Sequence, residues 1–172
     1  MFKKWLVSAN LIICLSMTCF SQEKRENTFA WLNVGLGYSS LGSWGGIASF
    51  NLQYKRILFA LRGTANTERL LEGDELFDVG LLIGYVLRSP TMIVTMSTGV
   101  ARVTGSFSLG GSGFFGGPRE SISPVLGIPF DVQIIARLGG NFGLGAYIYL
   151  DINSRKNFYG IAASIVIMGK SD

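Results

Sequence analysis

The chain has 172 residues, of which 48% are apolar and only 15% are charged, and it contains 23 glycines and no histidine. An ordinary soluble domain carries roughly 25% charged residues, so this composition is unusual for a soluble protein and excludes a disordered one. The absence of histidine excludes Ser-His-Asp and Cys-His catalysis and any zinc site with a histidine ligand. The length fits about one domain.

The first 21 residues have the layout of a cleaved secretory signal peptide. Lys3 and Lys4 precede an apolar run over residues 5–20, and a polar segment begins at Ser21. This run is short for a membrane-spanning helix, the alternative interpretation, which needs about 20 apolar residues. Residues 22–27 then form a short N-terminal tail.

Both cysteines, Cys14 and Cys19, lie in this first segment, so a processed chain contains no thiol. A lipid-modified Cys19 is an alternative to simple cleavage, but Thr18 and Ser16 do not match the small and aliphatic residues that usually precede a lipidated cysteine. Processing also removes two lysines, and no Lys/Arg-rich cluster remains that could follow a phosphate backbone. We therefore do not expect a nucleic-acid partner.

Beyond residue 27, eight segments alternate apolar and polar residues with a period of two, which indicates β-strands. Their lengths mostly fit the ~9–11 residues of a tilted membrane-spanning strand. The segments are residues 30–39, 48–55, 57–64, 77–87, 92–101, 122–137, 142–152 and 158–168.

One face of these strands is almost purely Leu, Ile, Val, Phe and Tyr, whereas the other is Gly, Ser, Thr, Asn and Gln with a few charges. A soluble barrel of the lipocalin kind points its apolar face inward and carries charges outside. The polar face here has too few charges for a water-facing surface and suits a barrel lumen, and the apolar face suits lipid. We predict an all-β, eight-stranded antiparallel up-and-down transmembrane β-barrel over residues 28–169, followed by a tail at 170–172. A soluble periplasmic barrel that binds lipid is the distant alternative.

The connections between these strands differ in length at the two ends of the predicted barrel. Tight turns are expected at 55–56, 88–90 and 139–141. At the opposite end, a short first connection is expected at 40–46 and longer ones at 64–75, 103–120 and 153–156. Short periplasmic turns and longer outer loops are typical of bacterial outer-membrane barrels. Outward aromatic residues are expected at the two membrane–water interfaces. They are Tyr38, Phe77 and Tyr159 at the outer rim, and Tyr54, Tyr85 and Phe142 at the periplasmic rim.

These features, with stretches such as Gly127-Ile128-Pro129-Phe130-Asp131-Val132 and Phe158-Tyr159-Gly160-Ile161, resemble the outer-membrane β-barrel domain proteins of Gram-negative bacteria, the broad OmpA/OmpX-like superfamily. The resemblance covers about residues 28–169. It implies an outer-membrane location, contact with membrane lipid and lipopolysaccharide, insertion by the barrel-assembly machinery, and no cofactor or metal. Such barrels often end in an aromatic residue, whereas this chain ends Ile167-Met168-Gly169-Lys170-Ser171-Asp172.

The first candidate site is a polar cluster in the lumen. A charge inside a narrow barrel must be paired or hydrated, so we expect Arg62 to pair with Asp131, Asp78 or both. We interpret the cluster as a structural plug, with a polar gate for ions as the alternative. The inward charged residues are Arg62, Asp78, Asp131, Asp151, Arg137 and Lys55.

Nine glycines fall on the inward face and leave space in the lumen. Eight strands enclose an interior just wide enough for side chains or one small ligand. We expect large inward side chains to fill this space, and a ligand cavity is the alternative. These side chains are Phe29, Trp31, Tyr147 and Tyr149.

The loops are the second candidate site. The glycine-rich segment 105–118 lacks the Gly-Lys-Ser/Thr ending of a phosphate-binding loop, and the acidic residues of 64–75 lack the spacing of an EF-hand. Exposed apolar residues in the longer loop are candidates for contact with lipopolysaccharide, a surface partner or the barrel mouth: Phe107, Leu109, Phe114 and Phe115. We predict a non-enzymatic structural or surface-interaction protein acting through loops 64–75 and 103–120. A narrow pore or a carrier for small solutes is the alternative.

Overall fold

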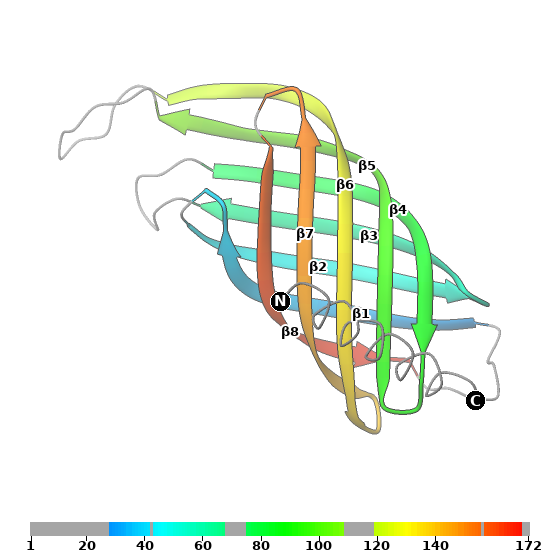
Figure 1. The fold of residues 1–172 in the computed structure, drawn as a ribbon. Coiled ribbons are helices and arrows are strands. Elements are labelled where there is room, and N and C mark those ends of the chain that lie inside the picture. The colour runs from blue at the N-terminus through cyan, green and yellow to red at the C-terminus, as the bar shows by residue number, and fades with distance from the viewer. Residues whose placement is uncertain (1–27, 42, 68–74, 109–118, 156, 170–172) are drawn as a thin grey trace, which may run out of the picture.

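Eight antiparallel strands close into a barrel in the order in which they follow along the chain (Figure 1). The computed structural model describes residues 28–41, 43–67, 75–108, 119–155 and 157–169, so the expected signal peptide and both tails lie outside the described residues. The strands are β1 (Thr28–Ser39), β2 (Ser43–Tyr54), β3 (Ile57–Thr67), β4 (Glu75–Arg88), β5 (Met92–Ser108), β6 (Arg119–Gly139), β7 (Phe142–Asn153) and β8 (Phe158–Met168). The predicted fold class and strand number are confirmed.

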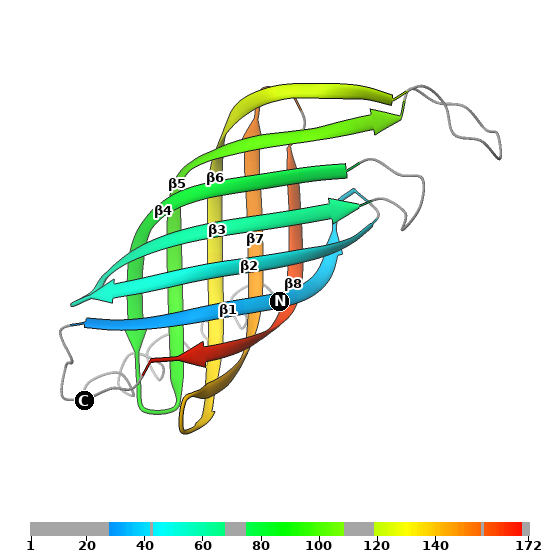
Figure 2. The ribbon, with the colours of Figure 1, turned by 180° about the vertical axis from the view of Figure 1, so that it is seen from behind.

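The barrel is closed by pairing of the first strand with the last. β1 and β8 are in register from Trp31 opposite Met168 to Ser39 opposite Gly160. The short turns β2–β3, β4–β5 and β6–β7 share one end with the start of β1 and the end of β8, and we call this the turn end; the opposite end is the loop end (Figure 2). Closure satisfies the backbone N–H and C=O groups of the two edge strands, which would otherwise face hydrocarbon without a hydrogen-bonding partner.

The two faces of the wall are as the alternation predicts. Large apolar side chains cover the outside, with Leu36 70% and Leu81 66% exposed, while polar side chains such as Asn51 and Gln133 are fully buried in the lumen. This is the reverse of a soluble protein, and it is the arrangement of a barrel whose outer solvent is lipid. A search of the described residues finds no helix of the length and apolarity that a membrane span requires.

The six predicted interface aromatics all lie on the outer surface and are between 43% and 62% exposed. The sequence reasoning did not single out Trp44, which is 72% exposed and lies opposite Tyr38 in the β1–β2 register. Tyr54 and Tyr85 both lie opposite Ile57, so they belong to the turn end as expected.

Three of the four loop-end connections are shorter than predicted, because the strands continue past the expected boundaries; the β7–β8 connection, 154–157, keeps its predicted length. β2 begins at Ser43, β3 continues to Thr67 and β4 begins at Glu75, so the second loop is 68–74. The predicted loop 103–120 contains the ends of two long strands, β5 with 17 residues and β6 with 21. Strands of this length exceed a membrane span, which places their outer halves beyond the apolar belt.

The alternation predicted for 122–137 is interrupted near its start. Val103 lies opposite Val125, but Gly105 lies opposite Ile122, so β6 contains one residue more than β5 over this interval. Such a β-bulge bends the strand and shifts the alternation by one residue. Ser123 and Pro124 are both exposed, because this part of β6 pairs with β5 alone and has no β7 beside it to close the lumen. Pro124 has no N–H to donate and fits an irregular position of this kind.

Glycines on the inner wall accept large side chains from neighbouring strands. A Cβ added at Gly160 would lie 2.4 Å from the Tyr149 hydroxyl oxygen, and one at Gly127 would lie 2.2 Å from an Asp151 carboxylate oxygen. The expected fillers Phe29, Trp31 and Tyr149 are at most 3% exposed. The lumen is therefore packed by large side chains that lie against glycines of the neighbouring strand.

We predict that Gly160→Ala destabilises the barrel by about 1–3 kcal/mol, the usual cost of overpacking a filled interior. Unfolding in urea from lipid vesicles measures the change. Gly63→Ala is the matched control, because the nearest atom to its added Cβ is 3.9 Å away. Tyr149→Leu removes the ring that the added Cβ would meet. Gly160→Ala should therefore lower the free energy of unfolding less in the Tyr149→Leu variant than in the unmodified chain. Additive effects of the two substitutions would contradict this account.

Candidate functional site: the closed polar centre of the lumen

The interior of the barrel is layered along its axis. An apolar cluster near the turn end contains Trp31, Leu58 and Ile135, and a second cluster toward the loop end contains Leu76 and Phe158. Between the two clusters, the inward side chains are mostly polar, and we call this middle section of the lumen the waist. Apolar side chains therefore enclose the polar side chains of the waist on both sides.

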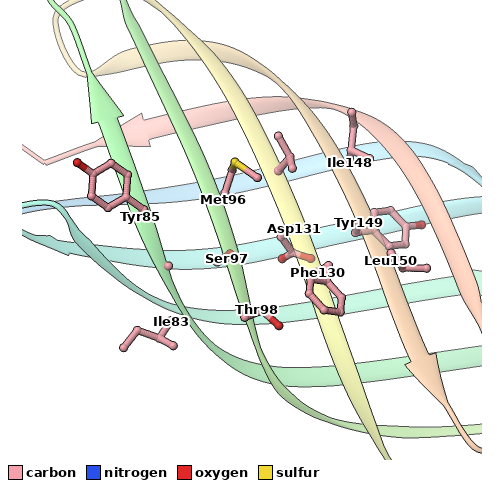
Figure 3. A pocket seen from close by; sticks show the side chains of 12 residues that line it. Ile83, Tyr85, Met96, Ser97, Thr98, Phe130, Asp131, Ile148, Tyr149 and Leu150 are labelled. Carbon is pink, nitrogen blue, oxygen red and sulfur yellow. The ribbon is translucent and has the colours of Figure 1, made fainter. Parts of the chain in front are cut away.

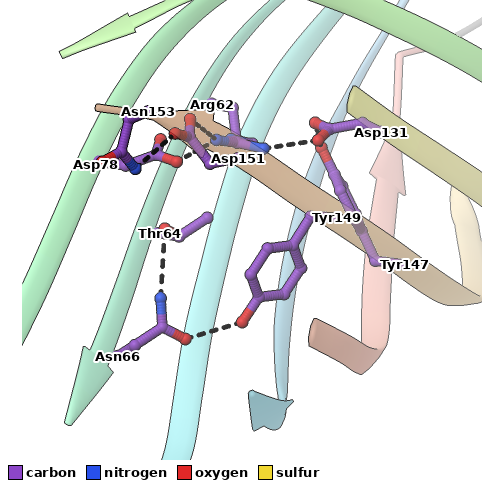
Figure 4. A network of polar contacts seen from close by, with 9 residues as sticks. All are labelled: Arg62, Thr64, Asn66, Asp78, Asp131, Tyr147, Tyr149, Asp151 and Asn153. Atoms are coloured by element: carbon purple, nitrogen blue, oxygen red, sulfur yellow. Dashed lines mark hydrogen bonds and ion pairs between the residues drawn. The ribbon is translucent and has the colours of Figure 1, made fainter. Parts of the chain in front are cut away.

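Arg62 on β3 is the centre of the polar layer (Figure 4). Its Nη1 donates to Asp131 Oδ1 at 2.5 Å, and its Nη2 donates to Asp78 Oδ2. Asp151 Oδ2 lies farther away, 3.6 Å from Nη2. The guanidinium therefore links carboxylates from β4, β6 and β7, and a planar fork of donors suits this geometry.

Tyrosines on β7 complete the polar layer. Tyr147 Oη donates to Asp131 Oδ2 at 2.6 Å, so this carboxylate accepts from both Tyr147 and Arg62. Tyr149 Oη donates to Asn66 Oδ1 at 2.7 Å. The alternation of β7 explains this arrangement, because Tyr147, Tyr149 and Asp151 occupy successive inward positions of one strand.

A second set of polar side chains lies one layer closer to the turn end. Gln133 Nε2 donates to Asn51 Oδ1 at 3.1 Å. Gln133 Oε1 accepts from Asn33 Nδ2 at 3.3 Å and from Trp31 Nε1 at 3.4 Å. Sequence reasoning missed this amide network, although each amide lies at an inward position of a predicted strand. Period-two alternation assigns the face, but it does not show which strands meet across the lumen.

The structure separates the six inward charged residues that the sequence suggested. Arg62, Asp78, Asp131 and Asp151 come together at the waist, whereas Arg137 is half-buried at the end of β6, near the turn. The placement of Lys55 in the lumen is wrong. Lys55 is exposed in the β2–β3 turn with φ of 57°, so the alternation of β2 ends before it, and its Nζ lies 5.5 Å from the centre of the Tyr54 ring.

The loop candidates have a different outcome. Phe107 belongs to β5, where it lies opposite Glu120 of β6, so its assignment to a loop is wrong. Leu109, Phe114 and Phe115 lie outside the described residues.

The polar centre is sealed from water. The side chains of Arg62, Asp78, Asp131 and Asp151 have no solvent-accessible surface. Within the described residues, no group of three or more His, Cys, Asp or Glu side chains is arranged to hold a metal ion. Arg62 thus connects four strands of the wall, β3, β4, β6 and β7, through buried ion pairs.

Comparison with known proteins gives the fold. No family model matches the chain, and no curated protein resembles its sequence. The solved structure of Neisserial surface protein A (NspA) matches with 16% identity and a TM-score of 0.55, over 84% of this chain and 96% of that one. The N-terminal β-barrel domain of Pseudomonas aeruginosa OprF matches with 10% identity and a TM-score of 0.62, over 84% and 98%.

Ail, the attachment invasion locus protein of Yersinia pestis, matches with 11% identity and a TM-score of 0.61, over 84% of this chain and 100% of that one. The chain has the fold of the small, OmpA/OmpX-like transmembrane β-barrels. At these identities the likeness concerns the fold alone.

We predict that Arg62→Met destabilises the barrel by about 3–5 kcal/mol, because it leaves buried carboxylates without their cation. Asp151→Asn should cost far less or be stabilising, since one guanidinium faces three carboxylates and Asp151 makes the longest of the three contacts. Urea unfolding in vesicles measures both. Arg155→Met, at an exposed position of the β7–β8 connection, is the control and should change stability by less than about 0.5 kcal/mol.

Proposed function

We propose that the chain is an integral protein of a Gram-negative outer membrane with a non-enzymatic surface-contact role, and that its lumen does not conduct. The observation that carries the proposal is the β5–β6 hairpin, which continues past the loop ends of β7 and β8, while β5 stays in register with β4 through Ser106 (Figure 2). β6 pairs with β7 only from Gly127 onward, so residues 119–126 of β6 are in register with β5 alone. A projecting hairpin of this kind presents a surface clear of the lipid.

The names of two structural neighbours support a surface role. One is a Neisserial surface protein and another is an attachment invasion protein. The location follows from a signal-peptide-like first segment and from a barrel with an apolar outer belt, and insertion by the barrel-assembly machinery follows from that location. In this proposal, segments 64–75 and 103–120 supply the contact surface, and lipopolysaccharide is its nearest neighbour.

The pore alternative lacks support from the lumen. Ions would have to pass the sealed layer around Arg62 and Asp131 and two apolar clusters. The soluble alternative conflicts with the apolar outer belt, which water would have to cover.

Cysteine labelling tests the location and the orientation. The only native cysteines lie in residues 1–21, so introduced thiols report single positions. Ser121→Cys on the projecting part of β6 and Asn141→Cys in the β6–β7 turn are both at exposed positions. We expect a membrane-impermeant maleimide to label Ser121→Cys in intact cells and Asn141→Cys only after lysis. Labelling of Asn141→Cys alone in intact cells, or recovery of the chain in the soluble fraction, contradicts the proposal.

Planar-bilayer recordings test the closed lumen. We expect near-zero conductance for the folded protein, because the polar layer has no solvent-accessible surface. Steady single-channel currents that change in Arg62→Ala would establish the gate instead.

Shortening the hairpin tests the contact role. Gly105 and Ile122 lie opposite each other, so a two-residue turn between them replaces residues 106–121, the outermost part of the hairpin, and keeps the rest of the β4–β5 and β5–β6 pairing. We expect the shortened protein to retain the heat-modifiable gel mobility of a folded barrel, while cells expressing it lose adherence to cultured host cells, the kind of contact that the name of the attachment invasion neighbour indicates. Equal adherence of cells with and without the hairpin overturns the contact role.

A further inference from the structure

The lipid-facing wall carries a groove of about 510 Å³ across β4, β5, β6 and β7 (Figure 3). Its walls are outward apolar side chains: Ile83, Tyr85, Met96, Phe130, Ile148 and Leu150. The groove is formed by two rows of outward side chains that lie opposite one another across the four strands. Each row contains one shorter side chain, Thr98 in the first and Val132 in the second. The shorter side chains between long ones create the depression.

The floor of the groove is the barrel wall itself. Gly84, Ser97, Asp131 and Tyr149 also line it, but the side chains of the last three are buried on the lumen side. They therefore contribute main chain, and the groove offers a lipid-facing surface whose side chains are apolar apart from Thr98. Such a surface suits a hydrocarbon chain.

A cation is held at the turn-end rim of this groove. Arg56 Nη1 donates to the hydroxyl of Tyr85 at 2.8 Å, and its guanidinium lies 6.0 Å from the centre of the Tyr85 ring. Lys55, the preceding residue, lies over Tyr54 in the same way. Both cations are exposed, and their partner rings are on the outer surface at the membrane interface.

The charge of the whole turn end has one sign. Among the described residues of this end, the charged side chains are Lys55, Arg56, Arg88 and Arg137. The described acidic residues lie in the lumen layer or in the loop-end halves of the strands. An anion that approaches the turn end from the membrane therefore meets cations and, within the described part of the chain, no carboxylate.

We propose that the groove and the Lys55–Arg56 turn form a binding site for one anionic glycerophospholipid of the leaflet at the turn end. The phosphate of the lipid binds the guanidinium of Arg56 and the ammonium of Lys55. One acyl chain lies in the groove, on the loop-end side of Tyr85. Arginine offers a donor fork that matches phosphate, and the Tyr85 hydroxyl holds the guanidinium in place before the lipid arrives. The site depends on the transmembrane barrel and is independent of the surface-contact role.

Native mass spectrometry of the folded barrel, released from vesicles of equal phosphatidylglycerol and phosphatidylcholine with identical acyl chains, tests the site. We expect one retained phosphatidylglycerol. Its preference over phosphatidylcholine should be at least about fivefold, the effect of one cation near an anionic membrane surface. Arg56→Gln should reduce this preference, and Lys55→Gln/Arg56→Gln should abolish it. Arg155→Gln, at the opposite end, is the matched control and should leave it unchanged.

The groove is tested separately from the cations. Thr98→Leu and Val132→Phe fill the depression with apolar side chains and should lower retention of both lipids, with heat-modifiable mobility reporting that each variant is folded. Tyr85→Phe keeps the wall but removes the hydroxyl that orients Arg56, so it should weaken only the preference for the anionic lipid.

Three results overturn the proposal. They are equal retention of both lipids by the unmodified chain, an unchanged preference in Lys55→Gln/Arg56→Gln, and a dimer that disappears in the folded groove-filling variants. The last result identifies a second copy of the chain as the occupant. The cysteine labelling above reports orientation independently, so a failure of this site is distinguishable from a failure of the proposed function.

Discussion

The wall of this barrel is a single sheet that separates two environments, and each strand must satisfy both with alternate residues. Outside, hydrocarbon offers no hydrogen-bonding partner, so the backbone groups must pair within the sheet, and the β1–β8 ladder completes that pairing. Inside, the lumen of eight strands is too narrow for bulk water, so polar side chains there must satisfy one another. The composition follows from this constraint, because half of each strand is apolar for lipid and the other half supplies the small, polar and large apolar side chains that fill the lumen.

The lumen meets its part of this constraint by complementary size and charge. Inner-wall glycines occur where side chains from adjacent strands cross, as Gly160 does beside Tyr149 and Gly127 beside Asp151. The same close approach brings Arg62 within reach of carboxylates from three other strands. Glycine content and buried charge are therefore two parts of one packing solution. Apolar clusters on both sides keep that polar layer dry, which favours a fixed cross-link over a conducting path.

Much of this fold could be predicted from the sequence, because burial of one face imposes a period of two that is visible without a structure. The inward faces predicted for Trp31, Arg62, Asp78 and Tyr149 are all confirmed. The prediction failed where that constraint ends. At the loop end, residues 119–126 of β6 pair with β5 alone and have no β7 beside them, so they need no apolar alternation and their sequence resembles a loop. Lys55 was placed inward because the alternation was extended into a turn with a left-handed backbone.

Contacts across the lumen were less accessible to sequence reasoning than the faces. The pairing of Arg62 with Asp131 and Asp78 could be suggested from charge and similar depth, but the amide network around Gln133 depends on strand register and barrel shear. The lipid-facing groove is of the same kind. It arises because Thr98 and Val132 lie beside longer side chains on neighbouring strands, which no single strand reveals.

A filled lumen has a consequence for where this protein can act. Since side chains occupy the interior and seal its charges, the surfaces left for recognition are the outer wall and the structures at its two ends. We propose different partners for these surfaces. The β5–β6 hairpin projects beyond the loop end, where the apolar belt has ended and extended backbone is available. The turn end stays at the membrane interface, where Arg56 and Tyr85 join a cation to an apolar groove. The lumen contributes rigidity to both, because the Arg62 network links β3, β4, β6 and β7, and three of these strands also carry the groove.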